Sequence, residues 1–394
     1  MEETTVNNGA ARKMSKSKGG AIRNIIQPGR MDMTFFVMVI ALLAVGLVCL
    51  FSSSYAYALQ NYGDSMHFIK RQIIFAVLGV AAMLVFSKIR YQIYKKFAWV
   101  IYAASLIMLI VVLILPPLQE GFNYKRWLAI GGFSFQPSEI AKFAIILLFS
   151  TLISKNIKYM KKARFGVLTF LVLLIPVVGL VVVEPHLSAT LLIFAIAVSL
   201  VIVGGVKLGY IVGALIAGVG LGGVAILSGV VGYGSSRIQS WINPWGDVSG
   251  DGWQTIQSLL SIGSGGMFGA GLGESRQKYL WVPEPQNDFI FSIVCEELGF
   301  VGAMAIIILF ALLIWRGFQI ATKSKNKFGS LMAFGLTIQV GIQAALNIMV
   351  VTNTVPNTGI SLPFFSYGGT ALIMLLSQMG MILAISRDCK VAKA

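Results

Sequence analysis

Apolar stretches alternate with short polar segments along almost the whole chain. Most of the stretches are about 17–25 residues long, which is the length that a transmembrane helix needs. The pattern therefore predicts an all-α polytopic membrane protein with about ten transmembrane helices. The predicted spans cover residues 33–54, 72–87, 97–115, 139–154, 165–183, 187–203, 208–229, 289–314, 329–351 and 369–386.

The composition agrees with this interpretation. Of the 394 residues, 57% are hydrophobic and only 12% are charged, whereas soluble domains average about 25% charged residues. The net charge of +16 could by itself indicate nucleic acid or anionic lipid as a partner. The distribution of the charges decides between a binding role and a role in membrane topology.

The basic residues gather on one side of the predicted membrane. With the N-terminus in the cytoplasm, 23 of the 31 Lys and Arg residues fall in cytoplasmic segments and 8 fall elsewhere. The positive-inside rule requires this distribution, so we expect both termini to be cytoplasmic and no nucleic acid to be bound. The large extracytoplasmic loop, about residues 230–288, then lies between spans seven and eight.

The chain divides into one membrane domain and two tails. Residues 1–31 are polar, basic and rich in Ser, Gly and Asn, so we expect a disordered cytoplasmic tail. Residues 32–387 form the transmembrane domain, and residues 388–394 form a second cytoplasmic tail. The three cysteines and two histidines predict neither a disulfide framework nor a zinc cluster.

The second outward loop carries polar and aromatic residues in succession. Lys125, Arg126 and Trp127 form a KRW triplet, and Trp at a membrane interface is common as an anchor. Glu139 and Lys142 follow at the start of span four, where their i, i+3 spacing places them on one helix face. The pair could neutralise itself or line a polar cavity, because ionisable residues at membrane depth are functional candidates by default.

The long outward loop is rich in glycine between residues 263 and 273. These glycines neither follow a predicted strand nor fit the GxGxxG register, so a nucleotide-binding turn is not favoured. A short amphipathic or re-entrant segment, in which glycines allow close backbone packing, fits better. Arg237, Arg276 and Lys278 add cationic groups that could bind phosphate oxygens or remain ordinary solvated charges.

The segment VPEPQNDFIFSIVCEELGF, residues 282–300, begins an apolar span with one carboxylate and carries two more. Asn287 or Asp288 is a natural N-cap for span eight. Along a helix, Glu296 lies about 12 Å from Asp288 and about 80° around the axis, and Glu297 lies about 180° around it. The three carboxylates therefore cannot face one pocket. We expect Asp288 at the outer mouth, and the glutamates paired with another helix or protonated.

Several motifs together resemble one protein family. In chain order they are KRW with PSE twelve residues later, EPHLSAT, NPW followed by GWQ, QSLLSIGSGGMFGAGLG, VPEPQNDFIFSIVCEELG and PNTGISLPFFSYGG. Their order over residues 33–387 resembles the SEDS family of FtsW, RodA and SpoVE, and WINPW with QKYLWVPEPQNDFIF is most similar to the FtsW and SpoVE branch. The chain departs from the family at His186, where Asp is frequent, and at Met349 and Asn353, where glycines are frequent.

The resemblance implies a function. Members of the family are peptidoglycan glycosyltransferases that polymerise lipid II, a polyprenyl-pyrophosphate-linked disaccharide peptide, at the outer face of the bacterial cytoplasmic membrane. They work with a class B penicillin-binding protein and other division-complex membrane proteins, and they need no organic cofactor. The resemblance places the family's essential Asp at Asp288 and its important Trp and Glu at Trp127 and Glu139. It also implies wall synthesis at the septum, in division or sporulation.

The chemistry of lipid II polymerisation suits these residues. A base must take the proton of the attacking sugar 4-hydroxyl, which contributes about 10²–10⁴ in rate, and Asp288 is the candidate. Positive charge must stabilise the departing pyrophosphate, from side chains or from a divalent cation such as Mg²⁺ or Mn²⁺. The candidate substrate-binding residues are Trp127, Arg126, Lys125, Glu139, Lys142, Arg237, Arg276 and Lys278.

Two alternative functions stay open. Buried charges and broken helices also occur in transporters, so the chain could be a flippase that moves lipid II across the membrane. It could also be a non-catalytic scaffold of the division complex. The sequence does not name the ligands of a cation.

Overall fold

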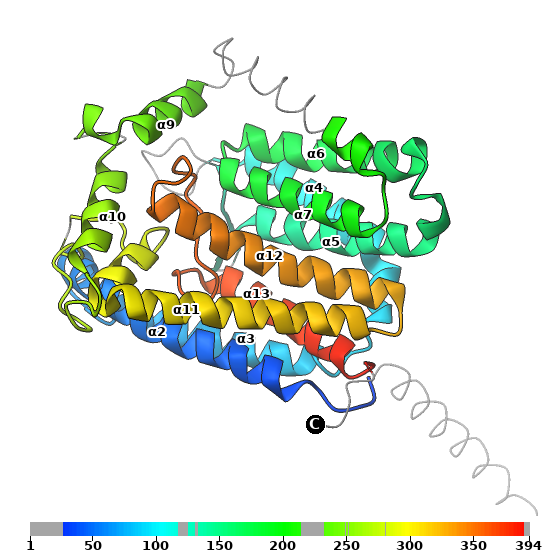
Figure 1. The fold of residues 1–394 in the computed structure, drawn as a ribbon, viewed down its shortest axis with the longest axis horizontal. Coiled ribbons are helices and arrows are strands. Elements are labelled where there is room, and N and C mark those ends of the chain that lie inside the picture. Colours follow the sequence, from blue (N-terminus) through cyan, green and yellow to red (C-terminus); the bar gives the residue numbers. More distant parts are fainter. Residues whose placement is uncertain are drawn as a thin grey trace, which may run out of the picture.

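The computed structural model describes residues 27–116, 125–130, 133–213, 232–248, 250, 252–279 and 281–389. Within these ranges the chain forms a bundle of long helices with one small strand hairpin (Figure 1). The long helices are α2 (Met33–Tyr62), α3 (His67–Phe86), α4 (Gln92–Ile114), α5 (Pro137–Asn156), α6 (Thr169–Val183), α7 (Leu187–Val203), α11 (Ile290–Lys323), α12 (Lys327–Val351) and α13 (Gly369–Ser386). The short elements are the antiparallel strands β1 (Leu128–Ile130) and β2 (Phe133–Phe135), and the helices α9 (Gly232–Ile242) and α10 (Trp253–Ser264).

The predicted all-α membrane bundle is confirmed. Eight helices of the described ranges are long and apolar enough to cross a membrane, and α7 is a shorter apolar helix. These nine helices correspond to nine of the predicted spans, but α2 and α11 extend well beyond the predicted ends, to Tyr62 and Lys323 instead of residues 54 and 314. The remaining prediction, 208–229, lies mostly outside the described residues, as do most of the N-terminal tail and the last five residues.

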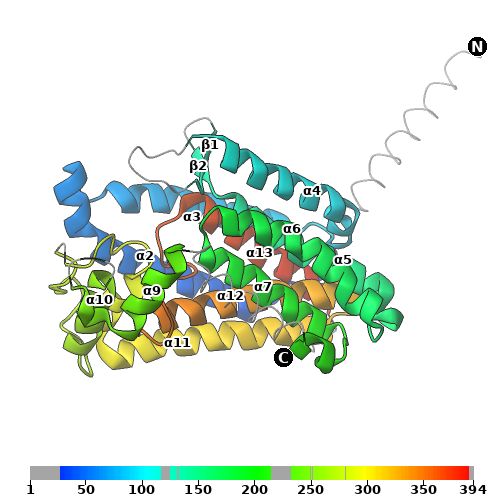
Figure 2. The same cartoon turned by 90° about the horizontal axis from the view of Figure 1, so that it is seen from above.

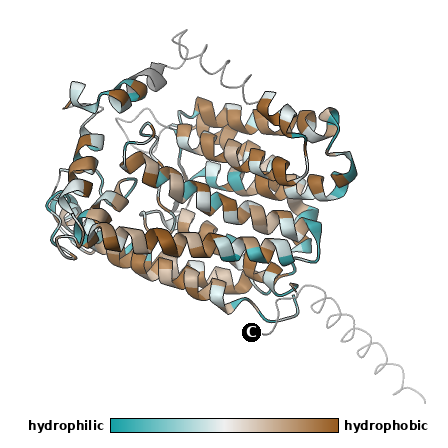
Figure 3. Cartoon of the chain, viewed as in Figure 1, coloured by the Kyte–Doolittle hydropathy of each residue, from teal (hydrophilic) through white to brown (hydrophobic). Residues whose placement is uncertain are grey.

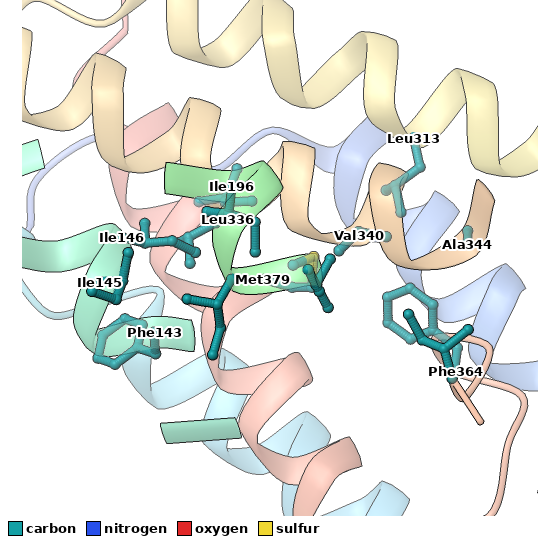
Figure 4. Packing of buried hydrophobic residues seen from close by; sticks show 14 of the residues in the cluster. Phe143, Ile145, Ile146, Ile196, Leu313, Leu336, Val340, Ala344, Phe364 and Met379 are labelled. Atoms are coloured by element: carbon teal, nitrogen blue, oxygen red, sulfur yellow. The ribbon is translucent and has the colours of Figure 1, made fainter. Parts of the chain in front are cut away.

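Helix α5 forms the centre of the bundle. Every residue from Ala141 to Thr151 is buried, and a helix that is buried on all sides must be surrounded by other elements. Figure 4 shows Phe143 and Ile146 of α5 against Ile196 of α7, Leu336 of α12 and Met379 of α13. Seen from above, α4 and α11 lie on opposite faces of this core (Figure 2).

The two ends of the described chain meet at one end of the bundle. The Gln27 amide donates to the Lys88 carbonyl at 2.7 Å, and the Asp32 amide donates to the Ser386 hydroxyl at 3.0 Å. Helices α9 and α10 lie at the opposite end (Figure 1). Apolar residues dominate the helices between these ends (Figure 3), as expected of a chain in which lipid replaces water around the bundle. The assignment of the termini to the cytoplasm stays a prediction from the charge distribution.

Helix α11 is broken, although its sequence predicts one uninterrupted span. Gly299 has φ 67° and ψ −171°, a conformation that only glycine adopts without strain. The break leaves backbone groups of the preceding and following turns without helical partners. In a membrane protein such groups must find partners in the protein.

The glycine-rich loop supplies those partners. The amides of Ala270 and Gly271 donate to the carbonyls of Glu296 and Glu297 at 2.9 and 3.0 Å, and the Phe300 and Val301 amides donate to the carbonyls of Gly266 and Met267 at 2.9 and 3.1 Å. A side chain at Gly265 or Gly269 would collide with the carbonyls of Cys295 or Glu297. The prediction that these glycines permit close backbone packing is confirmed.

Both glutamates of α11 are buried and fully partnered, as predicted. The Ser52 hydroxyl of α2 donates to the Glu297 carboxylate, with its oxygen 2.7 and 2.6 Å from the two carboxylate oxygens, and Lys278 forms an ion pair of 3.0 Å with Glu297. Glu296 accepts from Ser261 of α10 at 3.0 Å and from Ser275 at 2.6 Å. These bonds tie α2, α10 and the loop to the part of α11 that precedes the break.

Candidate active site

Asp288 lies at the end of the bundle where the long loop gathers, and its side chain is half-buried. Its backbone carbonyl accepts a hydrogen bond of 2.7 Å from Asn347 of α12, and Asn347 donates a second one to the Ile360 carbonyl. The neighbouring Asn287 carbonyl accepts from Ser366 at 2.8 Å. The backbone before α11 is therefore fixed from α12 and from the loop that follows it, which leaves the Asp288 carboxylate free for another role.

The predicted N-cap at Asn287 or Asp288 is wrong. Helix α11 begins at Ile290, its N-cap is Phe289, and no side chain caps it. The Asn287 amide nitrogen donates instead to a Glu284 carboxylate oxygen at 2.8 Å. An N-cap side chain must reach amides two or three residues further on, and here the segment is held by α12 in a different path.

Three charged side chains act on Asp288, one from the same segment and two from distant parts of the chain. Burial and the Glu284 carboxylate raise the pKa of Asp288 from 3.8 to about 6, and the positive charges of Arg126 and Arg237 oppose the rise. Among the described residues, no hydrogen bond or ion pair ends on this carboxylate. A β-carbon at Gly359 would lie 3.1 Å from its Oδ2 atom, so the wall beside the carboxylate has room for little more than a glycine.

Arg126 is held by the turn between α6 and α7. Its Nε donates to the Glu184 carbonyl at 3.3 Å, and its Nη2 donates to the Pro185 carbonyl. Its neighbours in the KRW triplet, Lys125 and Trp127, lie in other surroundings. Lys125 donates to the Leu113 carbonyl at the end of α4 at 3.1 Å, and Trp127 is 41% exposed just before β1. Of this triplet, Arg126 is the residue whose charge acts on Asp288.

Arg237 belongs to α9, which is docked on the loop after α12. Its Nη1 donates to the Asn357 carbonyl. Trp241 and Asn353 exchange two hydrogen bonds, Trp241 Nε1 to the Asn353 carbonyl at 3.0 Å and Asn353 Nδ2 to the Trp241 carbonyl at 3.3 Å. The docking brings a guanidinium from the long loop toward Asp288, which agrees with the predicted role of Arg237 as a cation of the site.

Glu139 and Lys142 form the predicted pair on one face of α5. Their ion pair measures 2.6 Å, and the lysine side chain is almost fully buried. Lys142 also donates to the Gln343 side-chain oxygen of α12 at 3.4 Å, and Gln343 donates to the Ser361 carbonyl at 3.1 Å. The pair thus neutralises itself and also links α5 to the loop that lies beside Asp288.

Glu184 was not predicted as a site residue. It is fully buried at the end of α6, and neither carboxylate oxygen has a hydrogen-bond partner among the described residues. Burial raises the pKa of Glu184 from 4.5 to about 8, against the opposing charge of Arg126. The sequence signal was available, because Glu184 ends a long apolar helix with no cation near it in the chain.

His186 lies beside Glu184 and is buried. Its ring nitrogen Nδ1 is 3.4 Å from both the Gln136 amide nitrogen and the Ser138 hydroxyl. Burial, together with the charges of Arg126 and Lys142, lowers the pKa of His186 from 6.5 to about 3. The histidine is therefore neutral at pH 7, which agrees with the predicted packing or hydrogen-bonding role.

Two other predicted cations, Lys278 and Arg276, are not among the charges that act on Asp288. Lys278 is buried, paired with Glu297, and donates to the Gly273 carbonyl at 2.6 Å, so its prediction as a phosphate-binding group is wrong. A buried ammonium needs a carboxylate partner to offset its desolvation, and Glu297 supplies it. Arg276 is exposed, and its backbone amide donates to Glu296 at 2.8 Å.

The described residues do not form a metal site by themselves. Among them, no three His, Cys, Asp or Glu side chains gather closely enough to hold an ion. The charged groups that act on Asp288 are one carboxylate and two guanidinium groups, and divalent cations such as Mg²⁺ prefer several oxygen ligands. The three cysteines are unpaired, as predicted.

Comparison with known proteins gives one consistent result. The family model of FtsW, RodA and SpoVE, described as "Cell cycle protein", matches residues 32–391. The chain is 37% identical to Stage V sporulation protein E of Bacillus subtilis over 357 residues, 90% of this chain and 97% of that protein. It is also 37% identical to the probable peptidoglycan glycosyltransferase FtsW of Trichlorobacter lovleyi, over 92% of this chain and 94% of that protein.

Two solved structures share the fold. One, described as "Structural coordination of polymerization and crosslinking by a peptidoglycan synthase complex", contains a chain with a TM-score of 0.72 and 26% identity, which covers 92% of this chain and 99% of that one. The rod shape determining protein RodA of Thermus thermophilus gives a TM-score of 0.66 at 26% identity, with coverage of 92% and 98%.

Proposed function

The chain belongs to the FtsW, RodA and SpoVE family of cell cycle proteins, and from this premise we propose that it is a peptidoglycan glycosyltransferase that polymerises lipid II. The reaction takes place at the outer face of the bacterial cytoplasmic membrane. The observation that carries the proposal is the Asp288 carboxylate, half-buried and without a partner among the described residues, beside two guanidinium groups.

Asp288 acts as the general base. It takes the proton of the 4-hydroxyl of one lipid-linked sugar while that oxygen forms a bond to the anomeric carbon of the growing chain. A catalytic base works best when its pKa lies near the operating pH, and a pKa of about 6 keeps Asp288 ionised at pH 7 while making it more basic than a solvated aspartate. Direct displacement inverts the anomeric centre, from an α-linked donor to a β-linked product.

Arg126 and Arg237 stabilise the leaving group. The bond from the anomeric carbon to the lipid pyrophosphate breaks as the new glycosidic bond forms, and negative charge builds up on the phosphate oxygens. Guanidinium groups held in place beforehand stabilise such charge without reorganising. Both arginines are fixed by backbone carbonyls, at Glu184 and Pro185 for one and at Asn357 for the other.

Glu139, Lys142 and Trp127 contact the substrate around Asp288. Glu139 and Lys142 lie on the side of α5 that reaches the loop near Asp288, and Trp127 offers an exposed ring at the outer end of the bundle. The polyprenyl tail of the substrate stays in the bilayer. A membrane bundle with its reacting groups at the outer end suits a substrate that never leaves the lipid.

The cation requirement and the partners form part of the proposal. A divalent cation, Mg²⁺ or Mn²⁺, would neutralise the pyrophosphate, with ligands supplied mainly by the phosphate oxygens because no three His, Cys, Asp or Glu side chains of the described residues gather there. A class B penicillin-binding protein cross-links the glycan product, and the protein works at the septum with other division-complex membrane proteins. The likeness to a chain of a peptidoglycan synthase complex supports the assignment to a synthase with a transpeptidase partner.

The deciding experiment is a lipid II polymerisation assay with purified protein. Wild type is compared with Asp288→Asn and with Glu274→Gln, an exposed carboxylate of the same loop, each with and without a class B partner and with EDTA. We expect polymer from wild type and Glu274→Gln, and none from Asp288→Asn. Normal polymerisation by Asp288→Asn would refute the assignment of the base.

The same variants separate the alternatives. A flippase would move lipid II across liposome membranes, and this movement would survive the Asp288→Asn substitution. A scaffold without activity would allow the Asp288→Asn gene to complement a deletion in cells. Either outcome, combined with absence of polymer from the wild type, would replace the glycosyltransferase proposal.

A further inference from the structure

We propose that the turn between α10 and the segment before Asp288 is a membrane anchor, in which Met267, Phe268 and Leu272 insert into the outer leaflet of the bilayer. The proposal concerns how the protein sits in the membrane and does not depend on the glycosyltransferase reaction. It rests on the exposure of these side chains, on their depth in the bundle, and on their continuity with the membrane-facing side of α11.

The three side chains are large, apolar and exposed. Met267 is 59% exposed, Phe268 82% and Leu272 55%, and they lie at the level of Phe300 and Val301, which are 57% and 49% exposed. We call these five residues the turn patch. No charged residue occurs between positions 252 and 273, although the loop is otherwise polar. Contiguous exposed apolar patches mark sites of interaction with a membrane or a partner.

Two polar contacts at different levels of the bundle show how deep in the membrane the turn patch lies. At the end where the chain termini meet, Asp32 and Arg316 form an ion pair of 2.8 Å. At the other end, Ser52 binds Glu297. Twenty residues separate Asp32 from Ser52 along α2, which is about 30 Å at 1.5 Å per residue. This is the thickness of the hydrocarbon core of a bilayer.

Helix α11 gives an independent measure of the same depth. After the break α11 continues to Lys323, and its stretch from Phe300 to Arg316, the residue paired with Asp32, corresponds to about 24 Å. The turn is hydrogen-bonded at the start of this part, where the Phe300 and Val301 amides donate to the carbonyls of Gly266 and Met267. Both helices therefore place the turn patch at the outer boundary of the hydrocarbon, not in the water above it.

The turn patch continues an exposed stripe of α11. Val301, Ile308, Leu312 and Trp315 are exposed apolar residues at the spacing of one helix face. Beyond the turn the chain becomes polar and aromatic. Tyr279 and Trp281 are 55% and 51% exposed, and such rings are typical of the membrane interface. Apolar residues at the turn followed by aromatic residues beside it are typical of a segment that lies in the membrane interface.

The turn is rigid enough to work as an anchor. Four backbone hydrogen bonds join it to α11 on both sides of Gly299. Gly266, Gly269 and Gly271 adopt the positive φ angles of the turn, which glycine does without strain. An anchor held in this way loses little conformational entropy on insertion. Since two of these bonds end on the carbonyls of Glu296 and Glu297, shortly after Asp288, the anchor would hold the reacting end of α11 at a fixed height above the lipid.

A spin label at the turn measures its depth directly. The full chain carries Cys389→Ser, while Cys49 and Cys295 are buried and remain in place. Labels at Phe268→Cys and Met267→Cys are compared with labels at Ile308→Cys, on the membrane-facing stripe, and at Val248→Cys, which is 50% exposed in the long loop. The protein is placed in phosphatidylcholine nanodiscs, and collisions with oxygen and with a neutral nickel chelate are recorded by power saturation.

The expected result is that the labels at 267 and 268 collide with oxygen as the label at 308 does, at a depth of about 5–10 Å below the headgroups. The label at 248 should collide with the nickel chelate. If labels at 267 and 268 behave like the one at 248, the turn lies in water and the proposal is wrong. Low collision rates with both reagents would mean that protein covers the turn, through a second copy, and would equally overturn it.

A second measurement tests whether Phe268 drives the insertion. A label at Leu272→Cys is recorded alone, with Phe268→Trp and with Phe268→Asp. We expect Trp to leave the label in the lipid and Asp to move it toward the water, because a carboxylate resists transfer into hydrocarbon. A label at 272 that Phe268→Asp does not move would contradict the proposal, and the Ile308 label reports whether each variant is folded.

Discussion

Two carboxylate-bearing regions lie at the end of the bundle opposite the chain termini, and the protein treats them in opposite ways. Glu296 and Glu297, inside α11, are buried with a full set of hydroxyl, amide and ammonium partners. Asp288 and Glu184 are also shielded from water, yet no hydrogen bond among the described residues ends on either carboxylate. The four groups share one chemistry and differ in whether the protein satisfies them.

The difference separates stability from function. A buried charge with all its partners holds elements together, and removing one partner costs several kcal/mol. A carboxylate that the protein leaves without partners is destabilising by itself and has a raised pKa, and such groups gather at sites where protons or charged substrates are handled. The glutamates of α11 therefore have a structural role, and the region around Asp288 has a catalytic role.

The largest effect should come from Asp288→Asn, which removes the base and leaves the shape. We expect the polymerisation rate to fall by about 10²–10⁴, while the thermal midpoint in detergent does not fall, because no partner loses a bond. The rate and the midpoint are measured on the same preparation. A lower midpoint with an unchanged rate would reverse the roles that the comparison assigns to the two regions.

Lys278→Ala should have the opposite profile. It leaves Glu297 buried without its cation, at a cost of about 3–5 kcal/mol, so the protein should unfold at lower denaturant or temperature. The double variant Lys278→Ala with Glu297→Ala removes both charges and should recover part of the loss. If Lys278→Ala unfolds like the wild type, the ion pair is not a structural contact.

Arg237→Ala tests the cations beside Asp288. Loss of a preorganised donor to a developing anion costs about 10²–10³ in rate, and we expect a loss of this order with lipid II as substrate. Arg276→Ala is the matched control, since this arginine comes from the same loop and is exposed. Equal effects of the two substitutions would mean that the loop acts by general charge and not through Arg237.

The pH dependence of the rate should report Asp288. A base must be ionised, so the rate should fall about tenfold per pH unit below a pKa of about 6. Burial is the main cause of the raised pKa of Asp288. Gly359→Ala narrows the space beside this carboxylate, so it should move the acid side of the pH–rate curve to higher pH. A rate that is level down to pH 4.5 would exclude a base with a raised pKa.

Glu184→Gln should have the smallest effect of these substitutions, and the property that changes should be the stability of the protein. The pKa of Glu184 is raised to about 8 in the folded protein, so the folded state holds a proton that the unfolded state releases above about pH 4.5. Stability contributed by this group is therefore lost as the pH rises from 4.5 to 8. Gln imitates the protonated acid, and we expect the variant to gain about 2–4 °C in midpoint at pH 8.5 and nothing at pH 4.5.

Much of the architecture could be predicted because lipid imposes a simple pattern. A helix that crosses hydrocarbon must be long and apolar, so nine of the predicted spans appear as helices of the described ranges. The Asp288 segment and the close packing of the glycine loop were also predicted, since carboxylates and glycines stand out against an apolar background. The resemblance to the FtsW, RodA and SpoVE family was confirmed by the family match.

Other features could not be predicted because they depend on partners far away in the chain. The break at Gly299 requires a loop whose amides and carbonyls replace those of the helix. Lys278 resembles Arg237 in the sequence, yet one pairs with Glu297 and the other docks beside Asp288. The N-cap prediction failed because Asn347 and Ser366 hold the chain before α11 in another path.

The sequence by itself determined which segments lie in the membrane and which polar residues are exceptional there, because hydropathy acts on each residue alone. Only the tertiary structure decided which of those residues are satisfied. Hydrogen bonds and ion pairs act over about 3 Å between groups that may be more than two hundred positions apart, as for Ser52 and Glu297. A buried carboxylate with such a partner is a structural contact, and one without a partner is a reactive group.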